Sequence, residues 1–159
     1  MLAVTLALAL AVTAQAPEII DRTLAIVSGR TVTLSDARTA LELGLVEGST
    51  IDAALVNRLV DRELMLREAE RYQPPEPSSG QVEAALKAAT QRAGGEAALS
   101  RVLAAGGFSA ERLRGWVRDD LRVAAYLQQR FPADERRPDQ IADWVSDLRR
   151  RAQITLFEP

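Results

Sequence analysis

Short runs of β-branched and apolar residues near the start of the chain predict a β-hairpin. Residues 23–27 and 31–34 are such runs, and Ser28-Gly29-Arg30 separates them. Glycine adopts positive φ at little cost, so this tripeptide favours a tight turn between two strands. We therefore expect a hairpin over about residues 23–34.

Most of the remaining chain carries apolar residues at helical spacing. The clearest helix carries Ile51, Leu55, Leu59, Met65, Leu66 and Ala69 at this spacing. We expect helices to begin near Ser35, at a capping-box-like pair formed by Ser49 and Asp52, and near Ser78, Gly95, Ser109 and Pro138. The prolines after Tyr72, the glycine pairs at 94–95 and 106–107, and Phe131-Pro132 supply the breaks between them. The pattern therefore predicts a mainly α-helical protein.

The helix after Ser109 has an apolar stripe, and it precedes a helix with a second tryptophan. The residues expected on the buried face are Leu113, Trp116, Val117, Leu121, Ala124 and Leu127. We expect Trp116 and Trp144 to be core anchors. Phe108, just before the cap, should pack near Leu113 as a hydrophobic staple.

The chain ends with a strand candidate at residues 154–157. A single terminal strand needs a partner, and the amino-terminal hairpin is the one on offer. We expect the final helix and strand, over about residues 138–157, to return to that hairpin. The predicted fold is thus helical with a small sheet built from both ends, in one domain over residues 17–159.

An apolar run at residues 2–14 precedes this domain. It is shorter than the roughly 20 residues that a membrane-spanning helix needs. The run is typical of the apolar region of a secretory signal, with small residues at Val12-Thr13-Ala14. We expect cleavage after Ala14, with Ala16 as the alternative, and no stable membrane insertion afterwards. The competing interpretation is an amino-terminal helix packed on the domain.

Composition excludes several classes of function. The 159-residue chain contains neither histidine nor cysteine. This rules out Ser-His-Asp and Cys-His catalysis, zinc fingers and thiol redox centres. The net charge of −2 and the aromatic content of 4% argue against nucleic-acid binding, which favours basic surfaces and stacking platforms.

The remaining polar motifs have ordinary structural explanations. The paired acids Asp119-Asp120, Glu68 with Glu70, and Asp134-Glu135 each lie beside arginine and fit solvated helix faces. The glycine pairs lack the Gly-Lys-Ser/Thr of a phosphate loop and fit helix ends. We therefore predict no catalytic residues, no metal site and no cofactor.

Three segments together carry a family resemblance. Residues 25–36 have a strand, a Ser-Gly turn, a second strand and a Ser-Asp helix start. Residues 59–69 end in Leu-x-x-Glu-Ala, and residues 107–114 open with Gly-x-Ser. In this order they resemble SurA-like periplasmic chaperones, over about residues 19–131 and 141–157. The resemblance implies the chaperone fold, in which the last helix and strand return to the hairpin.

The chain also departs from that family. Many relatives insert parvulin-type prolyl isomerase domains between the second long helix and the returning helix. Here only residues 132–140 separate them, too few for a domain of roughly 90 residues. Parvulin sites also depend on histidine. We therefore expect the chaperone core without the enzyme.

The resemblance implies ATP-independent binding of unfolded exported proteins, including outer-membrane β-barrel proteins, in the periplasm or another extracytoplasmic space. One alternative is a non-catalytic interaction or dimerisation module, so a homodimer is a second expected partner. A more distant alternative is a prolyl-isomerase-related protein without its catalytic domain. The candidate client-binding residues are Leu43, Leu45, Phe108, Trp116, Tyr126 and Leu127.

Overall fold

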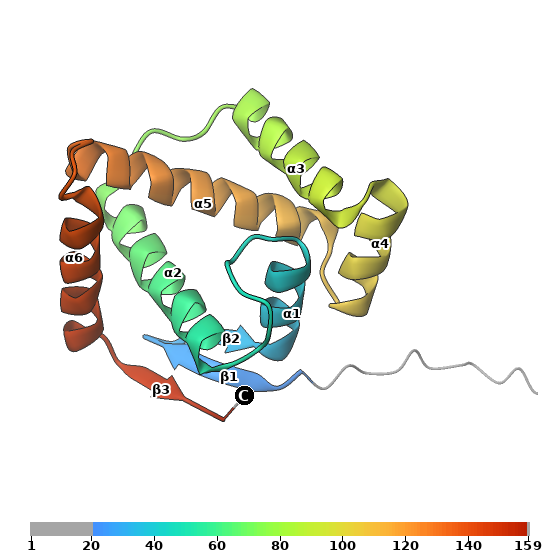
Figure 1. The fold of residues 1–159 in the computed structure, drawn as a ribbon, viewed down its shortest axis with the longest axis horizontal. Coiled ribbons are helices and arrows are strands. Elements are labelled where there is room, and N and C mark those ends of the chain that lie inside the picture. The colour runs from blue at the N-terminus through green and yellow to red at the C-terminus, as the bar shows by residue number, and fades with distance from the viewer. Residues whose placement is uncertain (1–20, 159) are drawn as a thin grey trace, which may run out of the picture.

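The computed structural model describes residues 21–158, which form a helical body on a small sheet (Figure 1). Within that range the elements are β1 (Thr23–Val27), β2 (Arg30–Thr33), α1 (Leu34–Glu42), α2 (Ala53–Tyr72), α3 (Ser79–Ala93), α4 (Glu96–Ala105), α5 (Ala110–Arg130), α6 (Arg137–Arg151) and β3 (Ile154–Leu156). The predicted fold class, mainly helical with a small sheet from both ends of the chain, is confirmed.

The sheet joins the two ends of the described chain. Its strand order is β2-β1-β3, and β1 pairs antiparallel with both neighbours. The turn between β1 and β2 has positive φ at Ser28 and Gly29, as a two-residue hairpin requires. On the other side of β1, Ile26 lies opposite Thr155. The expected return of the last strand to the hairpin is confirmed.

The start of α1 differs from the expectation by two residues. Thr33, not Ser35, is the N-cap, because its hydroxyl accepts from the Asp36 amide at 3.2 Å. The Asp36 carboxylate accepts from the Thr33 amide at 3.0 Å, which completes a capping box. Ser35 lies inside the helix, and its amide donates to Asp21. The expected caps at Ser78 and Ser109 are confirmed, whereas the helix expected to be capped at Ser49 begins three residues later, with Asp52 as its N-cap.

Two hydrophobic clusters hold the helices together. The larger cluster joins the sheet, α1, α2, α6 and the second half of α5, and includes Trp144 and Leu148. The smaller cluster joins α3, α4, the end of α1 and the first half of α5, and includes Leu43, Phe108 and Leu113. Trp144 and Phe108 are buried, which confirms their expected places in the core.

The buried stripe of α5 differs from the predicted one. Its fully buried residues are Leu113, Val117, Val123 and Tyr126, while Ala124 is exposed and Trp116, Leu121 and Leu127 are half-buried. The reason is that α5 packs against α3 and α2. The sequence pattern predicts one buried face along the whole helix, whereas the two halves of α5 bury different faces in two different clusters.

Candidate binding groove

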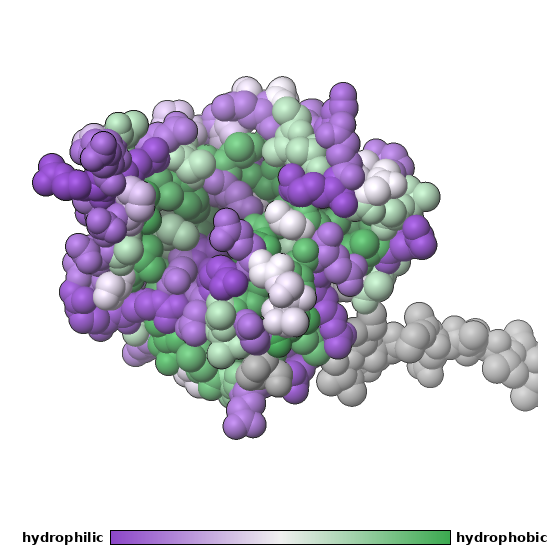
Figure 2. Space-filling model, in the orientation of Figure 1, coloured by the Kyte–Doolittle hydropathy of each residue, from purple (hydrophilic) through white to green (hydrophobic). Residues whose placement is uncertain are grey.

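A groove of about 820 Å³ opens between α2, α5, α6 and the loop that joins α1 to α2. Its apolar lining consists of Leu45, Val46, Met65, Val123, Ala124, Leu127, Pro138, Ile141, Ala142 and Val145. In Figure 2, green apolar surface lies between purple polar side chains on the side of the molecule where α6 runs. The groove is therefore an apolar recess with polar borders.

The apolar side chains come from elements far apart in the sequence. Met65 projects from α2, Val123 and Leu127 from α5, and Ile141 and Val145 from α6. The α2–α6 and α2–α5 contacts set the spacing of these walls. Because α5 and α6 both pack on α2, the groove is a product of tertiary packing.

Charged side chains border the groove, and each cation already has a partner. Arg149 pairs with Asp61, and it also donates to the Asn57 carbonyl at 2.9 Å. The Arg58 guanidinium donates to the Glu47 carbonyl at 2.8 Å. Three arginines and three acids line the groove (Arg58, Arg62, Arg149, Glu47, Asp61 and Asp120), so the border gives little preference for either sign of charge in a ligand.

Arg62 of α2 is the most buried charged residue of the site. Its side chain is 10% exposed and donates to Asp120 at 2.7 Å and to Glu63 at 2.9 Å. The guanidinium also lies 3.8 Å from the ring centroid of Trp116, a cation–π contact. Arg62 thus ties α2 to α5 beside the groove.

Two carboxylates of α5, Asp119 and Asp120, lie near this arginine, with 33% and 37% of their side-chain surface exposed. Burial raises the pKa of Asp120, and the nearby Arg62 charge only partly offsets it. Burial likewise raises the pKa of Asp119, although the positive charges of Arg62 and Arg122 act to lower it. A raised folded-state pKa means that the folded form binds the proton more tightly. The resulting stabilisation is present at acid pH and is lost as the pH rises through the folded pKa.

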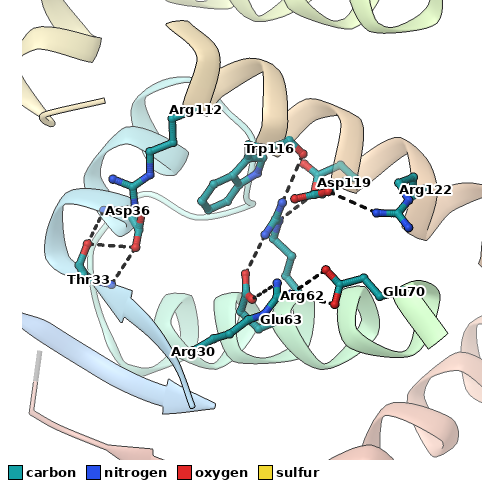
Figure 3. Close-up of polar contacts among 11 residues, drawn as sticks. Arg30, Thr33, Asp36, Arg62, Glu63, Glu70, Arg112, Trp116, Asp119 and Arg122 are labelled. Carbon is teal, nitrogen blue, oxygen red and sulfur yellow. Dashed lines mark hydrogen bonds and ion pairs between the residues drawn. The ribbon is translucent and has the colours of Figure 1, made fainter. Parts of the chain in front are cut away.

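A second, more polar hollow of about 430 Å³ lies on the other side of Arg62. Its lining includes Trp116, Asp119 and the ion pair between Arg112 and Asp36, whose oxygen and nitrogen atoms are 2.6 Å apart. Figure 3 shows this polar network between α2 and α5, with Arg62 at its centre. Its three arginines face three acids, so the hollow has no charge excess toward a ligand.

The six predicted client-binding residues fall into three environments. Leu45 and Leu127 line the groove together. Trp116 is half-buried, lies between the two clusters and borders the polar hollow. Leu43, Phe108 and Tyr126 are only 0%, 6% and 4% exposed. These three are core residues of the described structure, although Tyr126 also reaches a small hollow that it lines with Tyr72 and Arg130.

The prediction did not assign α6 to the site, although α6 provides one whole wall. In the sequence, Ile141 and Val145 are simply apolar residues at helical spacing. Their local signal is the same as that of core residues such as Leu148. The groove position follows from how α6 lies on α2, which no local pattern encodes.

Neither a metal cluster nor a membrane-spanning helix occurs in residues 21–158. That range holds no group of three or more acidic residues arranged to bind a metal ion. None of its helices is both long and apolar enough to cross a bilayer. The predicted signal segment, residues 1–14 or 1–16, lies outside the described residues.

Comparison with known proteins adds no functional assignment: neither the family models nor the curated proteins searched gave a match.

Proposed function

We propose that this protein is an ATP-independent chaperone that holds unfolded exported polypeptides, including outer-membrane β-barrel proteins. The observation that carries the proposal is the apolar groove between α2, α5 and α6. Contiguous exposed apolar surface with a polar border is typical of sites that bind other polypeptides. The resemblance of three sequence segments to SurA-like chaperones supports the same assignment.

The chemistry of the groove suits many clients. Its walls offer apolar contact without a fixed set of polar groups that would demand one sequence. The bordering arginines Arg58, Arg62 and Arg149 already have partners in the protein. A client segment can therefore bury apolar side chains without having to match a charge pattern.

The extracytoplasmic location is part of this proposal. It rests on the apolar run at residues 2–14, which is typical of a secretory signal. Its test is cell fractionation with detection of the new amino terminus, for which we expect cleavage after Ala14 or Ala16. A chain that stays uncleaved in the cytoplasmic fraction would contradict the location.

The experiment for the groove places a charge in its wall. Ala142 lies on α6 and lines the groove, and its side chain is exposed. Ala142→Glu should leave the fold intact and weaken client binding, because a carboxylate would lose hydration against an apolar client. The measurement is light scattering of a urea-diluted outer-membrane β-barrel protein at increasing ratios of chaperone to client.

Ala84→Glu is the matched control, since Ala84 is an exposed alanine of α3 outside the groove. Both variants change the net charge equally. We expect the parent chain and Ala84→Glu to suppress scattering near stoichiometric ratios without ATP. Ala142→Glu should require a several-fold higher ratio. Equal suppression by both variants would remove the groove from the mechanism, and no suppression by the parent would exclude general chaperoning.

A further inference from the structure

β3 is an edge strand of the described sheet, and the backbone groups on its outer side have no hydrogen-bond partner among residues 21–158. The Ser28 amide donates to Gln153, and the Phe157 amide donates to Leu24. These bonds show that residues 153, 155 and 157 direct their backbone groups toward β1. Because backbone groups alternate in direction along a strand, those of Ile154 and Leu156 point away from the sheet.

Exposed apolar side chains lie along the same edge. Leu156 is 51% exposed and Phe157 is 44% exposed. They are two of the three large hydrophobic residues that are exposed in residues 21–158. Proteins commonly protect sheet edges with charge, proline or a covering element. Within β3 itself, Ile-Thr-Leu contains none of the protective residues.

Charges of opposite sign flank β3. The exposed Arg151 ends α6 just before the strand, and the exposed Glu158 follows it. If two copies of β3 align antiparallel, the basic end of each strand meets the acidic end of the other. The strand is therefore complementary to itself, as a two-fold symmetric contact requires.

We propose that a second copy of this chain pairs with the outer edge of β3, which joins two sheets into one six-stranded sheet. The two-fold axis passes beside Thr155, so Ile154 of one copy lies opposite Leu156 of the other. Each of these two pairs exchanges two N–H···O=C bonds. Arg151 then lies near Glu158 of the other copy. This proposal does not depend on the proposed chaperone function.

The test is sedimentation velocity of the full chain over a concentration series, compared among variants. Leu156→Pro removes an amide hydrogen that β1 does not use, and edge strands tolerate proline. It should weaken dimerisation roughly tenfold or more, the effect of losing about 1.4 kcal/mol. Leu156→Ala is the control: it also shortens the side chain but keeps the amide, so it should weaken dimerisation less.

Charge reversal tests the register. Glu158→Arg alone should weaken the dimer, and Arg151→Glu combined with Glu158→Arg should restore it. A parent chain that is monomeric at all concentrations would overturn the proposal. So would a dimer that is insensitive to Leu156→Pro or to charge reversal, because it would use another face. Circular dichroism of each variant checks the fold, and client binding at the groove should be unchanged in Leu156→Pro.

Discussion

At the scale of single residues, Arg62 is a buried charged side chain that joins α2 to α5. It is buried, it bonds to Asp120, Glu63 and the Trp116 carbonyl, and it stacks on the Trp116 ring. Exposed ion pairs contribute little to stability, because water and side-chain entropy offset the attraction. A buried arginine with several partners contributes more to stability, since removing it leaves those partners without hydrogen bonds.

We predict that Arg62→Met lowers the free energy of unfolding by roughly 2–3 kcal/mol. Methionine retains much of the apolar stem, so the loss reflects the polar contacts. Arg71→Met is the comparison, because Arg71 is 64% exposed and, within residues 21–158, forms an ion pair with Glu68 alone. That variant should change stability by less than about 0.5 kcal/mol. Urea unfolding measures both, and equal effects would contradict the role given to Arg62.

At the scale of elements, α2 is the helix on which the rest of the fold is arranged. It packs against β1, α5 and α6, and it lines the groove. Its amino terminus is capped by Asp52, whose carboxylate accepts from the Leu55 amide at 2.8 Å. This backbone hydrogen bond is the main cause that lowers the pKa of Asp52.

We predict that Asp52→Asn, which keeps a capping acceptor, costs less stability at neutral pH than Asp52→Ala does. A lowered folded-state pKa contributes stability above the unfolded-state pKa, and this contribution is lost as the pH falls through the folded pKa. The advantage of the parent over Asp52→Asn should therefore disappear as the pH falls below about 4. Melting temperatures from pH 7 to pH 2 measure this, and a pH-independent difference would contradict it.

At the scale of the whole molecule, two hydrophobic clusters must unfold together for the protein to behave as one unit. Trp116 packs against both clusters, whereas Trp144 belongs to the larger one. Phe108 of the smaller cluster lies 6.0 Å from the Trp116 ring. The Trp116 side chain is thus a principal link between the two clusters.

We predict that Trp116→Ala costs about 3 kcal/mol and also separates the unfolding of the two clusters. Trp144 then remains as a fluorescent reporter of the larger cluster, while circular dichroism reports all helices. The two signals should give different midpoints in urea. In Trp144→Ala, fluorescence of Trp116 and circular dichroism should coincide. Coincident transitions in both variants would show that other contacts couple the clusters.

Local patterns of residues were sufficient to predict the helices and strands and their order, with shifts of two or three residues at the starts of α1 and α2. The helix starts at Ser78 and Ser109 follow from side chains that accept a hydrogen bond from the first turn, whereas the cap of α2 is Asp52 and not the expected Ser49. The unpaired strand at the end of the chain required a partner, so the contact between the two ends could also be predicted. The helix caps depend on neighbouring residues, and the strand pairing follows from the requirement that a strand form hydrogen bonds with a partner strand.

Which apolar residues line the groove depends on how distant helices pack, and no local pattern predicts it. Leu43 and Leu127 have the same side chain and similar helical contexts, yet Leu43 is fully buried and Leu127 lines the groove. The difference arises because α4 and the first half of α5 cover the end of α1, whereas α5 and α6 diverge over α2. A hydrophobic pattern shows which residues favour burial, but the packing of distant elements determines which of them remain accessible at the surface.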